Sequence, residues 1–154
     1  QVSLFGGGGA TFPTGDFSDL GNAETGWLIN GGVGIPVGEA GNVAIIGEAI
    51  YGSNGIEGID ASWDVFGLLG QVEYIFNPGE ATPWVFGGLG AVSLGADGVD
   101  SEWEAALNAA AGYSVPLGQS ANGWAGARYL HGFDNVTFFN LQAGITIPLG
   151  GGGM

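Results

Sequence analysis

Cysteine and basic residues are what the 154-residue sequence most obviously lacks. The absence of cysteine excludes disulfides, thiolate metal sites and cysteine nucleophiles. Arg128 is the only Lys or Arg, against fifteen acidic residues, so the formal net charge is -14. A surface of this composition cannot neutralise a row of phosphates, which excludes nucleic-acid binding. The sequence also has no run of about 20 apolar residues that would form a membrane-spanning helix.

Glycine is abundant instead, with 34 residues, and 45% of the chain is hydrophobic. Each glycine inside a helix costs about 1 kcal/mol relative to alanine, so a helical bundle is disfavoured. The hydrophobic content is too high for a disordered linker. The length fits one domain with a core of its own.

Eight segments alternate between apolar and polar or glycine positions, which indicates strands. They are Val2–Phe12, Gly26–Val37, Val43–Ser53, Trp63–Phe76, Trp84–Leu94, Glu104–Leu117, Trp124–Phe133 and Val136–Leu149. No long helix separates them, which favours an antiparallel meander. We therefore predict an all-β fold, a single eight-stranded antiparallel up-and-down β-barrel with a filled lumen over residues 1–149, followed by a glycine-rich tail at 150–154.

One segment, from Glu102 to Tyr113, also has high helix propensity. Taken alone it fits a helix as well as a strand. The strand count and the regular spacing of the turns favour a strand.

The connections and the acids divide between two rims. In a meander, successive connections fall on opposite rims, and here the longer ones fall on one rim, as in outer-membrane barrels. Eleven of the fifteen acids lie in or beside these longer connections: Asp16, Asp19, Glu24, Glu57, Asp60, Asp64, Asp97, Asp100, Glu102, Glu104 and Asp134. The sides of the barrel are left almost without charge, as a lipid-facing band or a sheath of neighbouring subunits requires.

Side-chain parity predicts which residues face outward. In the last strand, Phe139, Leu141 and Ile145 share the apolar face, opposite Asn140 and Gln142. The tryptophans fall near strand ends, Trp27, Trp63 and Trp103 at the long-loop rim and Trp84 and Trp124 at the short-turn rim. We expect them to form aromatic girdles or subunit contacts on the outer wall. Core packing in a soluble sandwich is the alternative.

Arg128 shares its parity with Leu130 and is expected to point into the lumen. A buried guanidinium needs a partner. The candidates are Glu73, Glu48 and Glu104, so we predict a lumen ion pair whose loss, in Arg128→Ala, lowers the melting temperature by several degrees.

Carboxylates cluster in the long connections. Asp97, Asp100 and Glu102 lie within six residues, and Asp60 and Asp64 belong to the neighbouring connection. Carboxylate oxygens suit Ca²⁺, so these five residues are candidate calcium ligands, although the pattern is not that of an EF-hand loop. Solvated loop acids are the alternative interpretation.

Two stretches carry a resemblance to a known family. The opening from Phe5 to Asp19 (FGGGGATFPTGDFSD) and the close from Asn140 to Leu149 (NLQAGITIPL) resemble the first strand and loop, and the last strand, of small bacterial outer-membrane β-barrels of the OmpA, OmpX and opacity type. The resemblance extends through the eight-strand layout to the whole chain. Members of that family serve as adhesins, anchors, small-solute passages or structural parts, so the fold alone does not give the function.

Two functional interpretations follow. The first is a non-enzymatic structural barrel in the bacterial outer membrane, with its apolar wall in the lipid bilayer. The second is an exported subunit that packs against copies of itself in an extracellular filament or tube, with Gly150, Gly151, Gly152 and Gly153 in the contacts. No nucleophile–base arrangement, histidine pair or phosphate-binding loop indicates an enzyme. The start at Gln1 leads us to expect an exported chain whose signal peptide has been removed.

Overall fold

A computed structural model describes residues 2–14, 23–38, 40–56, 58, 62–78, 80–96, 99–133 and 137–149. These residues form eight strands and no helix that could cross a membrane. The strands are β1 (Ser3–Pro13), β2 (Ala23–Val37), β3 (Val43–Ile56), β4 (Ser62–Ile75), β5 (Thr82–Ala96), β6 (Val99–Pro116), β7 (Asn122–Gly132) and β8 (Thr137–Pro148).

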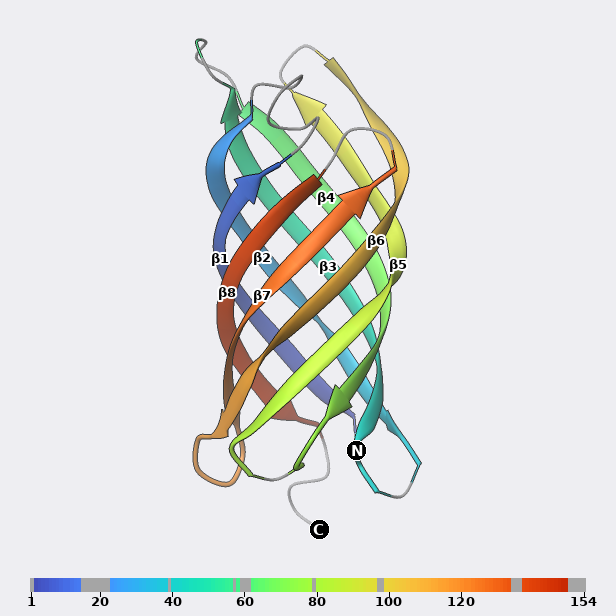
Figure 1. Ribbon diagram of the computed structural model, residues 1–154, viewed down its shortest axis with the longest axis vertical. Helices are drawn as coiled ribbons and strands as arrows, with labels where there is room; N and C mark the ends of the chain where they lie inside the picture. The colour runs from blue at the N-terminus through green and yellow to red at the C-terminus, as the bar shows by residue number, and fades with distance from the viewer. Residues whose placement is uncertain are drawn as a thin grey trace.

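Each strand pairs antiparallel with the next, and β8 pairs with β1, so the sheet closes into a barrel (Figure 1). The eight predicted segments are these strands, and the predicted fold class is confirmed. Closure satisfies the backbone hydrogen bonds of every strand and leaves no open edge.

The register fixes the tilt of the strands. Following paired residues around the barrel from Ser3, through Gly34 on β2 and on to Phe138 on β8, leads to Pro13, ten residues further along β1. A stagger of this size goes with strands tilted by roughly 40°. Residues at one level of the lumen therefore come from very different positions along their strands.

Successive connections alternate between two rims, as expected for an antiparallel meander. Both marked chain ends lie at the rim that carries the β2–β3, β4–β5 and β6–β7 turns (Figure 1). We call this the turn rim, and the opposite end the loop rim. Gly38 and Gly41 in the β2–β3 turn have φ of 81° and 73°, a left-handed conformation that glycine adopts without strain.

The ambiguous segment from Glu102 to Tyr113 is part of β6, so the prediction of a strand is confirmed. The strands at the loop rim are longer than predicted. Pairing of β5 with β6 continues past an irregularity at Leu94 to Ala96 and Val99, so the predicted long connection from Gly95 to Trp103 is largely hairpin. Strand pairing extends there because backbone hydrogen bonds do not depend on the apolar alternation that marked the predicted ends.

The period-two alternation separates the two faces of the wall. Asn140 and Gln142 on β8 are buried in the lumen, whereas Phe139, Leu141 and Ile145 are exposed outside, as predicted. The strands described run from Ser3 to Pro148, and the glycine tail lies outside the described residues, so the division at residue 149 stays a prediction.

Candidate functional site

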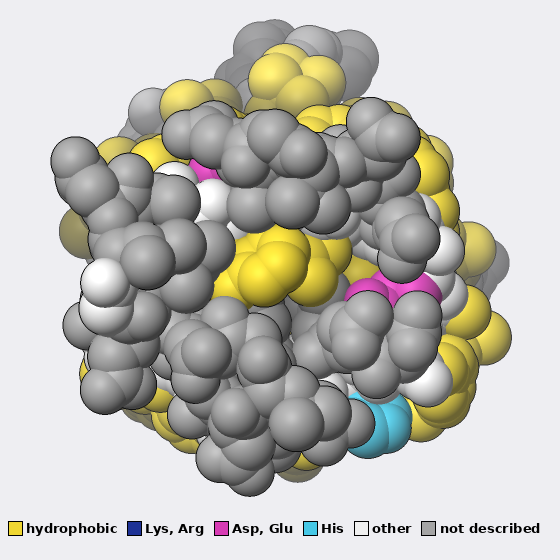
Figure 2. All heavy atoms as spheres, turned by 90° about the horizontal axis from the view of Figure 1, so that it is seen from above, with side chains coloured by type: hydrophobic (Ala, Val, Ile, Leu, Met, Phe, Trp, Pro, Cys, Tyr) yellow, Lys and Arg dark blue, Asp and Glu magenta, His cyan; other side chains and the backbone are white. Residues whose placement is uncertain are grey.

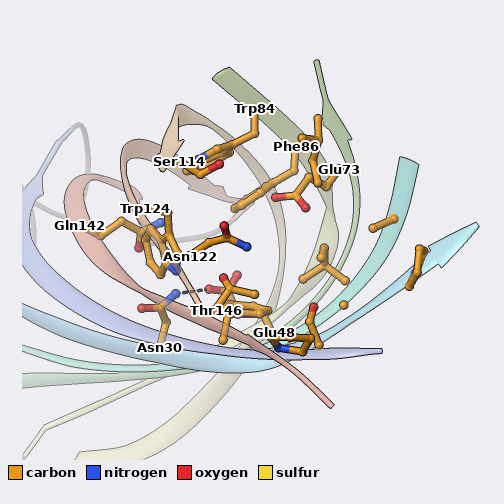
Figure 3. Close-up of a pocket in the computed structure, with 18 of the residues that line it drawn as sticks. Asn30, Glu48, Glu73, Trp84, Phe86, Ser114, Asn122, Trp124, Gln142 and Thr146 are labelled. Atoms are coloured by element: carbon orange, nitrogen blue, oxygen red, sulfur yellow. Dashed lines mark hydrogen bonds between the residues drawn. The ribbon is translucent and has the colours of Figure 1, made fainter. Parts of the chain in front are cut away.

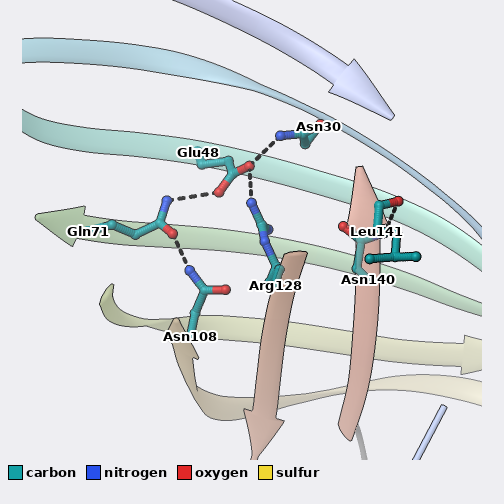
Figure 4. A network of polar contacts seen from close by, with 7 residues as sticks. All are labelled: Asn30, Glu48, Gln71, Asn108, Arg128, Asn140 and Leu141. Atoms are coloured by element: carbon teal, nitrogen blue, oxygen red, sulfur yellow. Dashed lines mark hydrogen bonds and ion pairs between the residues drawn. The ribbon is translucent and has the colours of Figure 1, made fainter. Parts of the chain in front are cut away.

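A polar network crosses the middle of the lumen, with the Glu48 carboxylate of β3 at its centre (Figure 4). Arg128 of β7 places its Nη2 2.5 Å from Glu48 Oε2, and both side chains are fully buried. Asn30 Nδ2 donates to the same oxygen at 2.6 Å, and Gln71 Nε2 donates to Oε1 at 2.8 Å. Asn108 donates in turn to Gln71 Oε1. Both carboxylate oxygens are thus hydrogen-bonded, as a buried charge requires.

The structure selects one of the three predicted partners of Arg128. The guanidinium pairs with Glu48 and lies 5.6 Å from the centre of the Phe86 ring, within cation–π range. Glu73 lines a cavity next to this network, and Glu104 lies on β6 towards the loop rim. Sequence parity placed all three acids in the lumen, and only the stagger of the barrel decided which of them meets Arg128.

An apolar cluster packs the lumen between this network and the loop rim. Its members are the buried side chains of Leu28, Ile50, Val65, Leu69, Val92, Ala106, Leu130 and Phe138, with Trp63 and Leu94 packed against them. Seen from the loop rim, hydrophobic side chains occupy the centre of the barrel (Figure 2). We call this group the lumen plug.

The other half of the lumen holds a cavity of about 380 Å³. Its walls come from all eight strands and reach residues at the turn rim such as Pro36 and Pro148. Glu48 and Arg128 belong to the wall on the network side. The cavity is thus closed on one side by the network and the lumen plug. Because of this cavity, the structure does not show a lumen that side chains fill along its whole length, and the filled lumen stays a prediction.

Four aromatic residues line this cavity: Phe5 of β1, Trp84 and Phe86 of β5, and Trp124 of β7. Figure 3 labels Trp84, Phe86 and Trp124. The rings of Trp84 and Phe86 stack with centroids 5.4 Å apart, and Trp84 meets Trp124 edge to face at 6.3 Å. Such geometries are favourable for aromatic pairs. Beside Phe86, and paired with it across the strands, the carboxylate of Glu73 faces the same space.

Glycines make room for the two indoles inside the barrel. A Cβ added to Gly126 would lie 2.8 Å from Trp84, and one added to Gly7 would lie 2.8 Å from Trp124. Gly112 and Gly144 are crowded still more closely by Trp84 and Trp124, respectively. The flat rings thus rest directly on backbone, a fit that a larger residue prevents.

This packing corrects the sequence prediction for part of the girdle. Trp84 is only 5% exposed, and both Trp84 and Trp124 lie in the lumen rather than on the outer wall. Trp63 packs against the lumen plug. Glycines beneath the rings of Trp84 and Trp124 leave the space that these two side chains occupy inside the barrel. Trp27 and Trp103 do lie outside, 48% and 56% exposed.

The outer wall is apolar along the barrel. Leu89 at mid-height on β5 is 61% exposed and pairs across the strands with Gly70 and Leu107. The aliphatic members of this wall include Ile29, Val33, Ile45, Leu68, Val72, Leu107, Leu141 and Ile145. The three charged side chains of the described mid-strand positions, Glu48, Glu73 and Arg128, all face the lumen. Lipid-facing strands require such a wall.

Exposed aromatic residues gather at both ends of this wall. Towards the loop rim, Tyr51 pairs with Phe66 across β3 and β4, and Phe139 pairs with Tyr129 and Phe12 across the strands beside it. Towards the turn rim the exposed aromatics are Tyr74, Phe76 and Tyr113. The turn-rim band is thus built by tyrosine and phenylalanine, where the sequence analysis had expected Trp84 and Trp124.

The candidate calcium ligands lie mostly outside the described part of the chain. Asp60 and Asp97 are outside it, and for Asp100 and Glu102 only the backbone, in β6, is described. Asp64 lies on β4, paired with Ser53 and Gly95. No group of three metal-ligating side chains occurs among the described residues. Calcium binding stays a prediction.

The aromatic cavity is the feature that sequence reasoning missed. The sequence does contain a signal for it. The inward-facing positions of β6, β7 and β8, which share their parity with the polar residues of these strands, include the glycines Gly112, Gly126 and Gly144. Trp124 shares its parity with the inward Arg128. A tryptophan at lumen parity, across from glycines, indicates an inward ring.

No protein-family model matches this sequence, and no characterised protein matches it by sequence. Solved structures do match in fold. Neisserial surface protein A superposes with a TM-score of 0.74 at 15% identity, covering 95% of both chains. The N-terminal β-barrel domain of Pseudomonas aeruginosa OprF gives 0.61 at 15% identity, covering 95% of this chain and 96% of that one. The attachment invasion locus protein of Yersinia pestis gives 0.57 at 14% identity, covering 95% of both. This chain therefore has the fold of the small eight-stranded outer-membrane β-barrels.

Proposed function

We propose that the protein is a non-enzymatic structural barrel that spans a bacterial outer membrane. The observation that carries the proposal is the outer wall, which is aliphatic at mid-height and bordered by exposed aromatic residues at both ends. Ten residues at about 3.3 Å each, tilted by roughly 40°, cover the ~25 Å of a typical barrel's apolar band. The likeness in fold to Neisserial surface protein A and to the attachment invasion locus protein of Yersinia pestis supports the same assignment.

The lumen supports a structural rather than a conducting role. The lumen plug and the network around Glu48 and Arg128 lie in series along the barrel axis. Side chains that fill an eight-stranded barrel leave no aqueous channel. The barrel therefore holds its wall in lipid without passing solutes, and no described cluster of side chains has the nucleophile and base of an enzyme.

The experiment is refolding from urea into phospholipid vesicles, read by the shift in gel mobility between heated and unheated samples. A membrane barrel folds in vesicles and in detergent, and aggregates without either. Dye-loaded vesicles carrying the folded barrel are expected to retain the dye. Failure to fold in vesicles, or rapid leakage, would contradict the proposal.

The same preparation tests the second interpretation. A self-assembling extracellular subunit folds without detergent and forms filaments or tubes visible by negative-stain electron microscopy. The glycine tail expected to make those contacts lies outside the described residues. The aromatic bands at two levels of the wall favour lipid as the medium around the barrel.

A further inference from the structure

The cavity in the turn-rim half of the lumen has an unbalanced charge. Three charged side chains line it, Glu48, Glu73 and Arg128. Glu48 and Arg128 neutralise each other through the 2.5 Å ion pair. Arg128 is the only Lys or Arg of the whole sequence, so no lysine or arginine of this chain is left to pair with Glu73. Either a proton or a cation from outside the chain therefore has to neutralise this carboxylate.

The surroundings of Glu73 determine which kind of cation fits. The carboxylate of Glu73 faces a space walled by Trp84, Phe86 and Trp124 (Figure 3). Both oxygens of Glu48 are already hydrogen-bonded within the network. A hard metal ion needs about six oxygen ligands, which the one remaining carboxylate does not provide. Aromatic rings beside a carboxylate are instead the surroundings that recognise organic ammonium ions.

The size and access of the cavity agree with a small ligand. Its volume of about 380 Å³ lies within the range of small-molecule sites. The lining reaches Ser114 and Asn122 near the turn rim, while the network closes the opposite side. A ligand therefore enters from the turn rim and leaves by the same route.

We propose that this cavity is a binding site for a small organic ammonium ion, with the Glu73 carboxylate as the counter-charge and Trp84, Phe86 and Trp124 as the aromatic wall. The binding needs only the folded barrel, not a bilayer. A test in detergent is therefore independent of the proposed membrane role, and either proposal can fail without the other.

The test is calorimetric titration of the detergent-folded barrel with choline and with its neutral analogue 3,3-dimethylbutan-1-ol. Choline is expected to bind saturably, and to bind roughly tenfold or more tightly than the neutral analogue, which lacks the charge. Quenching of tryptophan fluorescence by choline reports the same event, because two of the five tryptophans line the cavity.

Two matched variants locate the site. Glu73→Gln keeps the shape of the side chain and removes its charge, and is expected to weaken choline binding roughly tenfold or more. Glu80→Gln removes one acid from the β4–β5 turn, outside the cavity, and is expected to bind choline as the natural sequence does. Heat-dependent gel mobility establishes that each variant is folded.

Three outcomes would overturn the proposal: no saturable choline binding, equal binding of the neutral analogue, or unchanged choline binding in folded Glu73→Gln. Equal binding of the analogue would make the cavity a purely apolar site. Unchanged binding in the variant would place the ammonium ion elsewhere on the barrel.

Discussion

Arg128 on β7 and Glu48 on β3 form an ion pair across the lumen, 80 residues apart in sequence and fully buried. The pair joins opposite sides of the barrel, because β3 and β7 lie four strands apart in the closed eight-stranded sheet. Asn30 and Gln71 complete the hydrogen bonds of the carboxylate. Removing one partner of such a pair leaves an uncompensated buried charge, whereas removing both does not.

The first prediction therefore concerns this pair. Arg128→Met is expected to lower the free energy of unfolding by about 3 kcal/mol, because Glu48 is left charged and buried. Adding Glu48→Gln is expected to recover most of that loss. Urea unfolding in detergent, followed by tryptophan fluorescence, measures both. Equal stability of the natural chain and Arg128→Met would show that the pair does not stabilise the barrel.

The second prediction concerns the glycines beneath the lumen tryptophans. In Gly126→Ala the new Cβ would lie 2.8 Å from the Trp84 ring and 2.6 Å from the Ala111 carbonyl oxygen. Overpacking of this kind costs about 1–3 kcal/mol. Unfolding by urea is expected at lower concentration, with a change in the tryptophan emission of the folded state.

Gly47→Ala is the matched control, because a Cβ added to Gly47 meets nothing within 4 Å. It lies on β3, away from both indoles. Its stability is expected to equal that of the natural chain within about 0.5 kcal/mol. If both variants lose the same stability, the loss comes from replacing any glycine in a strand. The close fit of the Trp84 ring to the backbone then does not contribute to the stability of the barrel.

The third prediction tests the outer wall in lipid. Leu89→Arg places a charge at mid-height of the aliphatic wall and is expected to destabilise the barrel in vesicles by about 2–4 kcal/mol. Leu117→Arg, at a position that is 50% exposed near the turn rim, is expected to cost at most about 1 kcal/mol. Urea titration in phosphatidylcholine vesicles measures both, and equal costs would contradict a lipid-facing wall.

The fourth prediction comes from the acids of the long connections. If Asp97, Asp100 and Glu102 hold Ca²⁺, millimolar calcium raises the midpoint of thermal unfolding and chelation lowers it, because a ligand that binds only the folded state stabilises it. Asp100→Asn is expected to abolish the difference, and Asp64→Asn to reduce it. Identical melting curves with calcium and with chelator would contradict calcium binding by these residues.

Glycine and tryptophan show where sequence reasoning was insufficient. In β5 both faces read as apolar or glycine, with Trp84 and Phe86 on one face and Val85 and Leu89 on the other. The alternation therefore could not tell which face was the lumen. Position near a strand end favoured a girdle. Gly112 on β6 pairs with Trp84, and Gly126 on β7 pairs with Gly112, so these glycines become neighbours of the ring only through a strand register that the alternation does not specify.

The sequence by itself determined the eight strands, their antiparallel order and the uncharged wall, because alternation at period two and the spacing of turns are local properties. It also determined that Arg128 would be inside and would need an acid. Only the tertiary structure decided that this acid is Glu48, that Trp84 and Trp124 line a cavity, and that Glu73 faces them. These outcomes depend on the ten-residue stagger with which the sheet closes, which brings together side chains from strands far apart in the chain.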